Sequence, residues 1–152
     1  VRDAASLALA GPEKMDHMVA ALADEDAAVR YWAATALGNL GKAAADAKDR
    51  LRSHLADDSP VVRVAAARAL ARMGEATDAL PVLEAVLDNG AQWARVHAAI
   101  TLDEMDEDAR PSIAAMERNK AYRKGMVADG KYTVRVLNRA LNELNGTYNV
   151  VK

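Results

Sequence analysis

The chain repeats an acidic residue and an arginine six positions apart. Asp24 precedes Arg30, Asp57 precedes Arg63, and Arg95 holds the same place in a third copy. A guanidinium group is planar and always charged, and it binds carboxylates or phosphates through paired hydrogen bonds. Such arginines, repeated along a chain, could form a repeated anion site.

Histidines and clustered carboxylates are the residues that could bind a metal. The chain has three histidines and no cysteine, which excludes thiolate zinc sites and cysteine nucleophiles. His17, His54 and His97 occupy different positions in the repeats described below, so we expect separate histidines and no zinc site. An acidic run lacks the alternation and the glycine of an EF-hand loop, and we expect it to be a solvated turn; it comprises Asp103, Glu104, Asp106, Glu107 and Asp108. We expect no cofactor in this chain.

A basic run near the C-terminus is the second charged feature. It consists of Arg118, Lys120, Arg123 and Lys124, with Tyr122 among them. It could bind a sulfated or phosphorylated polymer, or it could be a solvated loop.

The overall charge argues against nucleic acid as a partner. Residues 1–108 contain 11 Lys and Arg against 19 Asp and Glu, a balance of −8, whereas residues 109–152 contain 9 against 3. An acidic repeat region is unsuited to a phosphate backbone. No apolar run approaches the roughly 18 residues that span a bilayer, so we expect no membrane segment, and no signal peptide is visible.

An internal repeat must position these residues. Asp24–Gly41 and Asp57–Gly74 are 33 residues apart and share eight of eighteen positions, and Asn89–Asp106 is a third copy. Apolar residues recur at helical spacing within each copy, and a second amphipathic segment lies between copies. Each repeat is therefore predicted to be two antiparallel helices.

The predicted chain is one all-α domain of about four to five helix pairs. Its parts are a half repeat at 1–11, repeats at 12–41, 42–74, 75–106 and 107–144, and a tail at 145–152. We expect Ser59 to cap a helix N-terminus. Two sets of residues mark further helix ends: first turns at Pro12, Pro60, Pro81 and Pro111, and left-handed C-terminal caps at Gly11, Gly41 and Gly74. Because residues 1–11 read as a second helix without its partner, we expect more protein upstream.

The repeat resembles the HEAT repeats, in particular a short, alanine-rich bacterial class. The shared pattern is D-x-x-x-x-V-R-x-x-A-x-x-A-L-x-x-L, and it covers nearly the whole chain. The resemblance implies a right-handed α-α superhelix. It also implies a structural ladder, in which each arginine bridges Asp side chains or helix ends in neighbouring repeats. This is the alternative to the anion site for the set Asp24, Arg30, Asp57, Arg63 and Arg95.

The resemblance also indicates a partner surface. The helix that carries the Val-Arg pair lines the concave side of HEAT arrays, and Tyr31, Val64 and Val96 align across three copies. Trp32, Arg68 and His97 extend this set as positions where the copies differ. The stripe could bind a partner, or it could serve packing between repeats.

A narrower resemblance concerns GKYTVRVLNRALNELNGTYNVV, residues 130–151. It is similar to the C-terminal extension of some bacterial sulfatases of the sulfoglucosamine type. This implies an upstream, calcium-dependent catalytic domain that carries formylglycine and acts on sulfated glycans in the periplasm or outside the cell. The sulfatase signature, Cys or Ser followed by x-Pro-Ser-Arg, is absent from this chain, so no catalytic residue is assigned.

Two main functional hypotheses follow. The first is a non-catalytic scaffold at the C-terminus of a bacterial hydrolase, with a sulfatase as the candidate, that contacts its own catalytic domain, an oligomer partner or an anionic glycan. The second is an independent protein–protein interaction module that uses the groove. Without the sulfatase link, we expect a cytoplasmic protein.

Overall fold

The computed structural model describes residues 5–6, 9–121 and 128–147. The chain divides into two compact units, an N-terminal unit, Val1–Val82, and a C-terminal unit, Leu83–Lys152. Throughout the described residues the only regular elements are helices, which confirms the all-α prediction there. None of the helices in these same ranges is both long and apolar enough to cross a bilayer.

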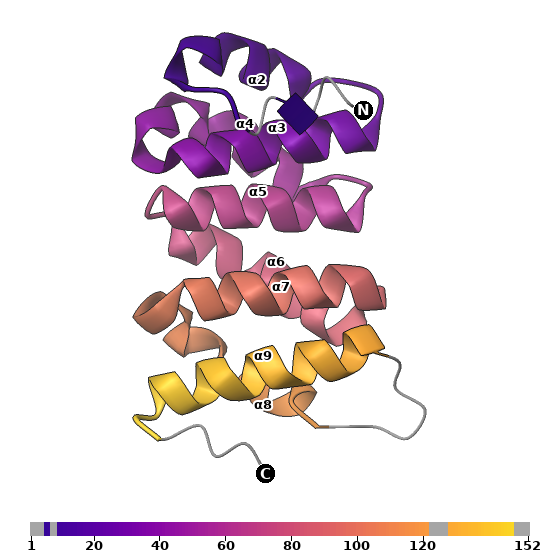
Figure 1. The fold of residues 1–152 in the computed structure, drawn as a ribbon, viewed down its shortest axis with the longest axis vertical. Helices are drawn as coiled ribbons and strands as arrows, with labels where there is room; N and C mark the ends of the chain where they lie inside the picture. Colours follow the sequence, from indigo (N-terminus) through magenta and orange to yellow (C-terminus); the bar gives the residue numbers. More distant parts are fainter. Residues whose placement is uncertain (1–4, 7–8, 122–127, 148–152) are drawn as a thin grey trace. The chain divides into compact units, whose positions relative to one another are not determined.

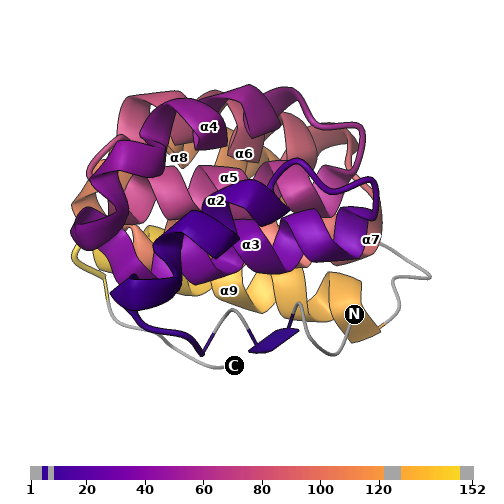
Figure 2. The same ribbon diagram turned by 90° about the horizontal axis from the view of Figure 1, so that it is seen from above.

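The N-terminal unit is built of helix pairs (Figures 1 and 2). Its elements are η1 Pro12–Lys14, α2 Met15–Ala21, α3 Ala27–Leu40, η2 Gly41–Ala47, α4 Lys48–Ser53, η3 His54–Ala56 and α5 Pro60–Arg72. Helix α6, Ala76–Asn89, begins in this unit and ends in the next. Helix α2 packs on α3, α4 packs on α5, and α3 and α5 lie side by side.

Small residues let α3 and α5 approach closely. The core of this unit contains Leu37 and Leu70 together with many alanines, and all of these side chains are buried. At Gly38, an added Cβ atom would lie 3.0 Å from the Cα atom of Ala69. Alanine and glycine therefore bring the two helix backbones together, and the leucines fill the remaining space.

Carboxylates begin the second helices of the N-terminal unit. Asp26 caps α3, because its side chain accepts a hydrogen bond of 2.8 Å from the Ala28 N–H. The prediction for Ser59 is wrong in part: it occupies the N-cap position of α5, but its side chain makes no capping hydrogen bond. The Asp57 carboxylate instead accepts the Ser59 N–H at 2.9 Å.

Two of the three predicted glycine caps have positive φ. Gly74 follows α5 with φ 88°, and the Glu75 N–H bonds the Leu70 carbonyl at 2.9 Å, which closes the helix as a Schellman motif does. Gly41 has φ 55° at the end of α3. The prediction for Gly11 is wrong: with φ −82° it precedes η1 instead of ending a helix in the left-handed region.

Two of the four prolines predicted for first helical turns lie there, and two do not. Pro12 and Pro60 stand in first helical turns, as predicted. Pro81 lies inside α6, because that helix begins earlier, at Ala76, where the Asp78 N–H bonds the Glu75 carbonyl. Its missing N–H leaves only one helical bond unmade, next to the first turn. Pro111 lies near the end of η4, the element that directly precedes α8. It is therefore not in a first helical turn, and that prediction is wrong.

The C-terminal unit repeats the plan. Its elements after α6 are α7 Gln92–Glu104, η4 Asp106–Ser112, α8 Ile113–Asn119 and α9 Ala128–Leu144. Helices α7 and α9 lie side by side (Figure 1). The fully buried side chains of this unit include Leu83, Leu87, Leu102, Met116 and Leu137.

The end of α9 is fixed by contacts with its own unit. The Arg110 guanidinium donates a hydrogen bond of 2.9 Å to the Leu144 carbonyl. Gly146 follows with φ 64°, and Thr147 turns back so that its N–H bonds the Asn142 carbonyl at 2.8 Å. The rest of the predicted tail, and most of the predicted half repeat at 1–11, lie outside the described residues.

Candidate functional site

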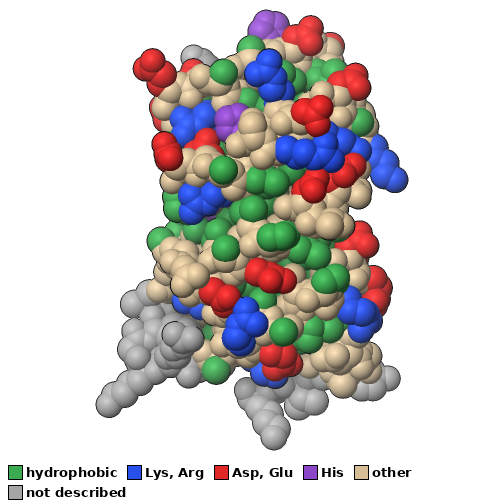
Figure 3. All heavy atoms as spheres, turned by 180° about the vertical axis from the view of Figure 1, so that it is seen from behind, with side chains coloured by type: hydrophobic (Ala, Val, Ile, Leu, Met, Phe, Trp, Pro, Cys, Tyr) green, Lys and Arg blue, Asp and Glu red, His purple; other side chains and the backbone are tan. Residues whose placement is uncertain are grey.

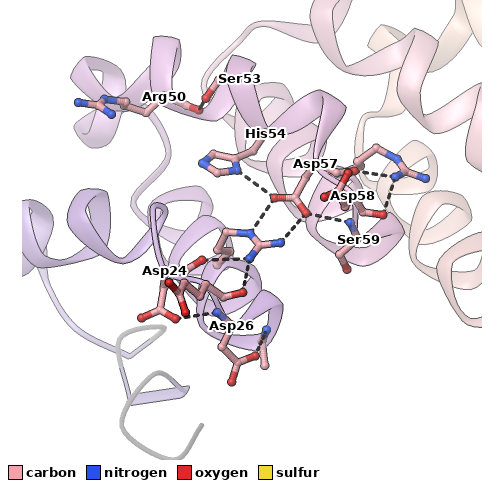
Figure 4. A network of polar contacts seen from close by, with 12 residues as sticks. Asp24, Asp26, Arg50, Ser53, His54, Asp57, Asp58 and Ser59 are labelled. Carbon is pink, nitrogen blue, oxygen red and sulfur yellow. Dashed lines mark hydrogen bonds and ion pairs between the residues drawn. The ribbon is translucent and has the colours of Figure 1, made fainter.

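Arg30 joins the first and second repeats by binding Asp57, which Figure 4 shows within a network of polar contacts. Its Nε and one terminal nitrogen donate hydrogen bonds of 2.8 and 2.9 Å to the two carboxylate oxygens of Asp57. Its other terminal nitrogen bonds the backbone carbonyls of Asp24 and Glu25 at 3.0 and 2.9 Å. All three guanidinium nitrogens are therefore used within the protein. This geometry is that of a structural bridge and leaves Arg30 no nitrogen without an internal partner.

Arg63 repeats one half of the Arg30 arrangement, the hydrogen bonds to backbone carbonyls just before its own helix. Arg63 bonds the Asp57 and Asp58 carbonyls at 2.7 and 3.2 Å, as Arg30 does in its own turn. The Asp24 side chain does not meet an arginine among the described residues; it accepts the Asp26 N–H at 2.8 Å.

In the C-terminal unit an amide replaces the carboxylate. Arg95 donates to the Asn119 side-chain oxygen at 3.0 Å. The Asn119 amide nitrogen donates in turn to Asp88 at 2.7 Å. The Arg95 Nε is buried and has no hydrogen-bond partner in the described part of the chain. The bridge at Arg95 is therefore weaker than the two-bond bridge at Arg30.

Asp57 stays ionised at unusually low pH. Burial by itself would raise the pKa of this carboxyl, whose side chain is only 6% exposed. Hydrogen bonds from Arg30, from the Ser59 N–H and from His54, together with the charge of Arg30, outweigh burial and lower the pKa of Asp57 from 3.8 to about 2. The ionised form is thus the form that the fold stabilises.

This pKa predicts a specific loss of stability in acid. Because the folded-state pKa lies below the ordinary value, the stabilisation is complete above about pH 5 and is lost as the pH falls through 2. The difference in unfolding free energy between the wild-type chain and Asp57→Asn should therefore narrow by about 2 kcal/mol between pH 5 and pH 2. Urea unfolding at both pH values measures it. A constant difference would show that Asp57 is not held as a carboxylate.

The predicted partner stripe is only partly accessible. Tyr31, Trp32 and Arg68 are half-buried, and the Tyr31 and Trp32 rings meet edge to face with centroids 5.1 Å apart. Tyr31 also packs against the core of its unit. The inclusion of Val64 and Val96 is wrong, because they are 2% and 7% exposed. Side chains buried to this degree offer a partner almost no surface.

His97 pairs with an aromatic ring. It is half-buried, and its ring lies 4.1 Å from that of Trp93, measured between centroids, in an edge-to-face arrangement. Trp93 is 56% exposed. Of this pair, the Trp93 ring is the part that is accessible at the start of α7.

A groove lies between α7 and α9, and its α9 wall was not predicted. Its volume is about 400 Å³, and its lining is Ile100, Asp103, Glu104, Tyr132, Arg135, Val136 and Arg139. Tyr132 is 51% exposed. The sequence identifies Val134-Arg135 as another copy of the repeat, and that signal could have extended the predicted surface to α9. The groove is of a size that holds one or two side chains of a ligand.

The basic run is neutralised where it is described. Arg118 pairs with Asp88 at 2.9 Å, and Lys120 pairs with Glu117 at 2.5 Å. Arg123 and Lys124 lie outside the described residues. Figure 3 shows a similar alternation of acidic and basic side chains over one face of each unit. The described part of the run therefore has little charge left for a polyanion.

The histidines and the acidic run have individual surroundings. His17 is exposed, and His54 lies 3.2 Å from the Asp57 carboxylate (Figure 4). In the acidic run, Asp103 bonds Arg139, and Glu107 pairs with Arg110 at 2.8 Å. Among the described residues no group of three or more histidines and carboxylates is arranged to hold a metal ion.

Comparison with known families identifies the repeat. A family model of HEAT repeats matches residues 15–103, which is more than half of the chain, and the chain therefore belongs to the HEAT repeat proteins. No curated protein matches it. HEAT repeats suggest a helical scaffold that takes part in protein–protein interaction. The narrower resemblance to a sulfatase extension stays a prediction.

Proposed function

We propose that the chain is a protein-binding scaffold whose partner contacts the groove between α7 and α9. The observation that supports this is the groove itself. The groove is formed by faces of α7 and α9 that do not belong to the core between these helices. It combines accessible apolar side chains with charged ones. Protein interfaces have this composition, with an exposed aromatic residue near the centre and charges around it.

Contact with the partner can be tested by photo-crosslinking. A photoreactive phenylalanine derivative replaces Tyr132 in the full chain, expressed in the organism of origin. We expect a discrete adduct with one protein, because Tyr132 is half exposed at the groove. The matched control carries the same group at Ala114, an exposed position on α8. Equal adducts at both positions, or none at Tyr132, would refute a partner at the groove.

A second candidate places the scaffold beside a sulfatase. We propose it on the similarity of residues 130–151 to a sulfatase extension; residues 130–144 of this stretch belong to α9. Calcium and the catalytic residues would then belong to an upstream domain, in the periplasm or outside the cell. An anionic glycan is less well supported as a direct ligand, since Arg118 and Lys120 are paired. Sequencing the gene upstream of Val1 tests the proposal, and an upstream region without a sulfatase signature contradicts it.

A further inference from the structure

Some charged side chains of the α7–α9 groove are paired with each other, and one is not paired with any described residue. Asp103, 8% exposed, accepts hydrogen bonds from both Nε and a terminal nitrogen of Arg139, so these two residues neutralise each other. Glu104 also has an internal interaction. Arg135, in contrast, is exposed and pairs with no carboxylate among the described residues. Of the lining residues that the structure describes, Arg135 is therefore the cation available to a ligand.

Apolar groups lie within one helical turn of this cation. Tyr132 precedes Arg135 by three residues and Arg139 follows it by four, so the three share one face of α9. Val136 on α9 and Ile100 on α7 are both half-buried and line the same groove. An aliphatic side chain could enter between Ile100, Val136 and the Tyr132 ring while a neighbouring carboxylate reaches Arg135.

We infer that the groove binds a peptide segment in which a single carboxylate stands next to a large aliphatic side chain. The inference rests on the proposed function and specifies the ligand of that same site. Arginine binds a carboxylate through two parallel hydrogen bonds, which gives direction as well as affinity. A strongly acidic segment is disfavoured, because the two carboxylates of the lining, Asp103 and Glu104, balance its two arginines and leave the groove without a net positive charge. A volume of about 400 Å³ accommodates one or two side chains of an extended segment and is too small for a folded domain.

Fluorescence anisotropy with a short synthetic peptide tests the inference. The probe is fluorescein-labelled Gly-Ser-Leu-Leu-Glu-Ser-Gly with an amidated C-terminus, titrated with the full chain. We expect saturable binding that weakens about three- to fivefold when glutamine replaces the glutamate, and more when lysine replaces it. Arg135→Glu should weaken binding of the glutamate peptide by a similar factor, and Tyr132→Ala should weaken it about three- to tenfold.

Arg50→Glu is the matched control. Arg50 is an exposed arginine on α4 whose side chain has no ion pair in the described residues, and Figure 4 shows it pointing away from the Asp57 network. This variant should bind like the wild type, and circular dichroism should show all variants equally helical. No binding, equal binding of the lysine peptide, or full binding by Arg135→Glu would overturn the inference. A crosslinked partner at Tyr132 combined with any of these results would refute the ligand class and leave the protein-binding scaffold standing.

Discussion

Replacing Asp57 with alanine is expected to destabilise the N-terminal unit by about 3 kcal/mol, because it leaves a partly buried guanidinium without its partner. The Arg30 and Asp57 side chains are only 15% and 6% exposed. The substitution removes two hydrogen bonds to Arg30 and the bond from the Ser59 N–H at the start of α5. An exposed ion pair would contribute much less, at most about 1 kcal/mol.

Tryptophan fluorescence can follow the two units separately. Trp32 lies in α3 of the N-terminal unit and Trp93 in α7 of the C-terminal unit. In a Trp93→Phe background, urea unfolding followed at Trp32 should shift to lower urea for Asp57→Ala. Asp58→Ala is the control, since Asp58 is exposed and only its backbone carbonyl bonds Arg63. Equal shifts for the two variants would show that the bridge contributes nothing beyond the charge of an aspartate.

The helices of this protein were predictable because their signals are local. The Asp and Arg of the repeat, its alanine stripe and the glycine that follows each recur within eighteen residues. The structure begins and ends α3 and α5 at those signals. Pro81 shows the limit of such signals: α6 begins at Ala76, where the Asp78 N–H bonds the Glu75 carbonyl, and the proline is tolerated near the first turn.

Accessibility could not be predicted from the alignment of the copies. Tyr31, Val64 and Val96 hold equivalent positions, yet only the tyrosine is partly accessible. The repeat gives a residue's place on its helix, whereas exposure depends on how far the side chain extends and on which side chains surround it. The α9 wall of the groove was missed for a related reason. It depends on how α9 pairs with α7, and the spacing from Arg135 to the next leucine landmark, Leu141, is one residue shorter than in the other copies.

The role of Gly38 is a second point that the shared positions of the repeat did not indicate. It lies inside α3, where glycine lowers helix stability by about 1 kcal/mol relative to alanine, so a compensating reason is expected. That reason is the close approach of α5, whose Ala69 Cα and Cβ atoms would lie 3.0 and 3.1 Å from a Cβ on residue 38. The neighbouring atom is backbone and belongs to a packed helix, so it cannot move aside as a flexible side chain would.

Gly38→Leu is therefore expected to destabilise the N-terminal unit by about 3 kcal/mol, since four heavy atoms must enter a filled contact and force α3 and α5 apart. Gly38→Ala should cost much less, because the gain in helix propensity offsets part of the tight contact. Ala20→Leu, on the exposed face of α2, adds similar bulk outside the core and should change stability by less than about 0.5 kcal/mol. Urea unfolding followed at Trp32 in the Trp93→Phe background measures all three. A midpoint for Gly38→Leu equal to that of Ala20→Leu would mean that α3 and α5 do not meet at Gly38 and Ala69.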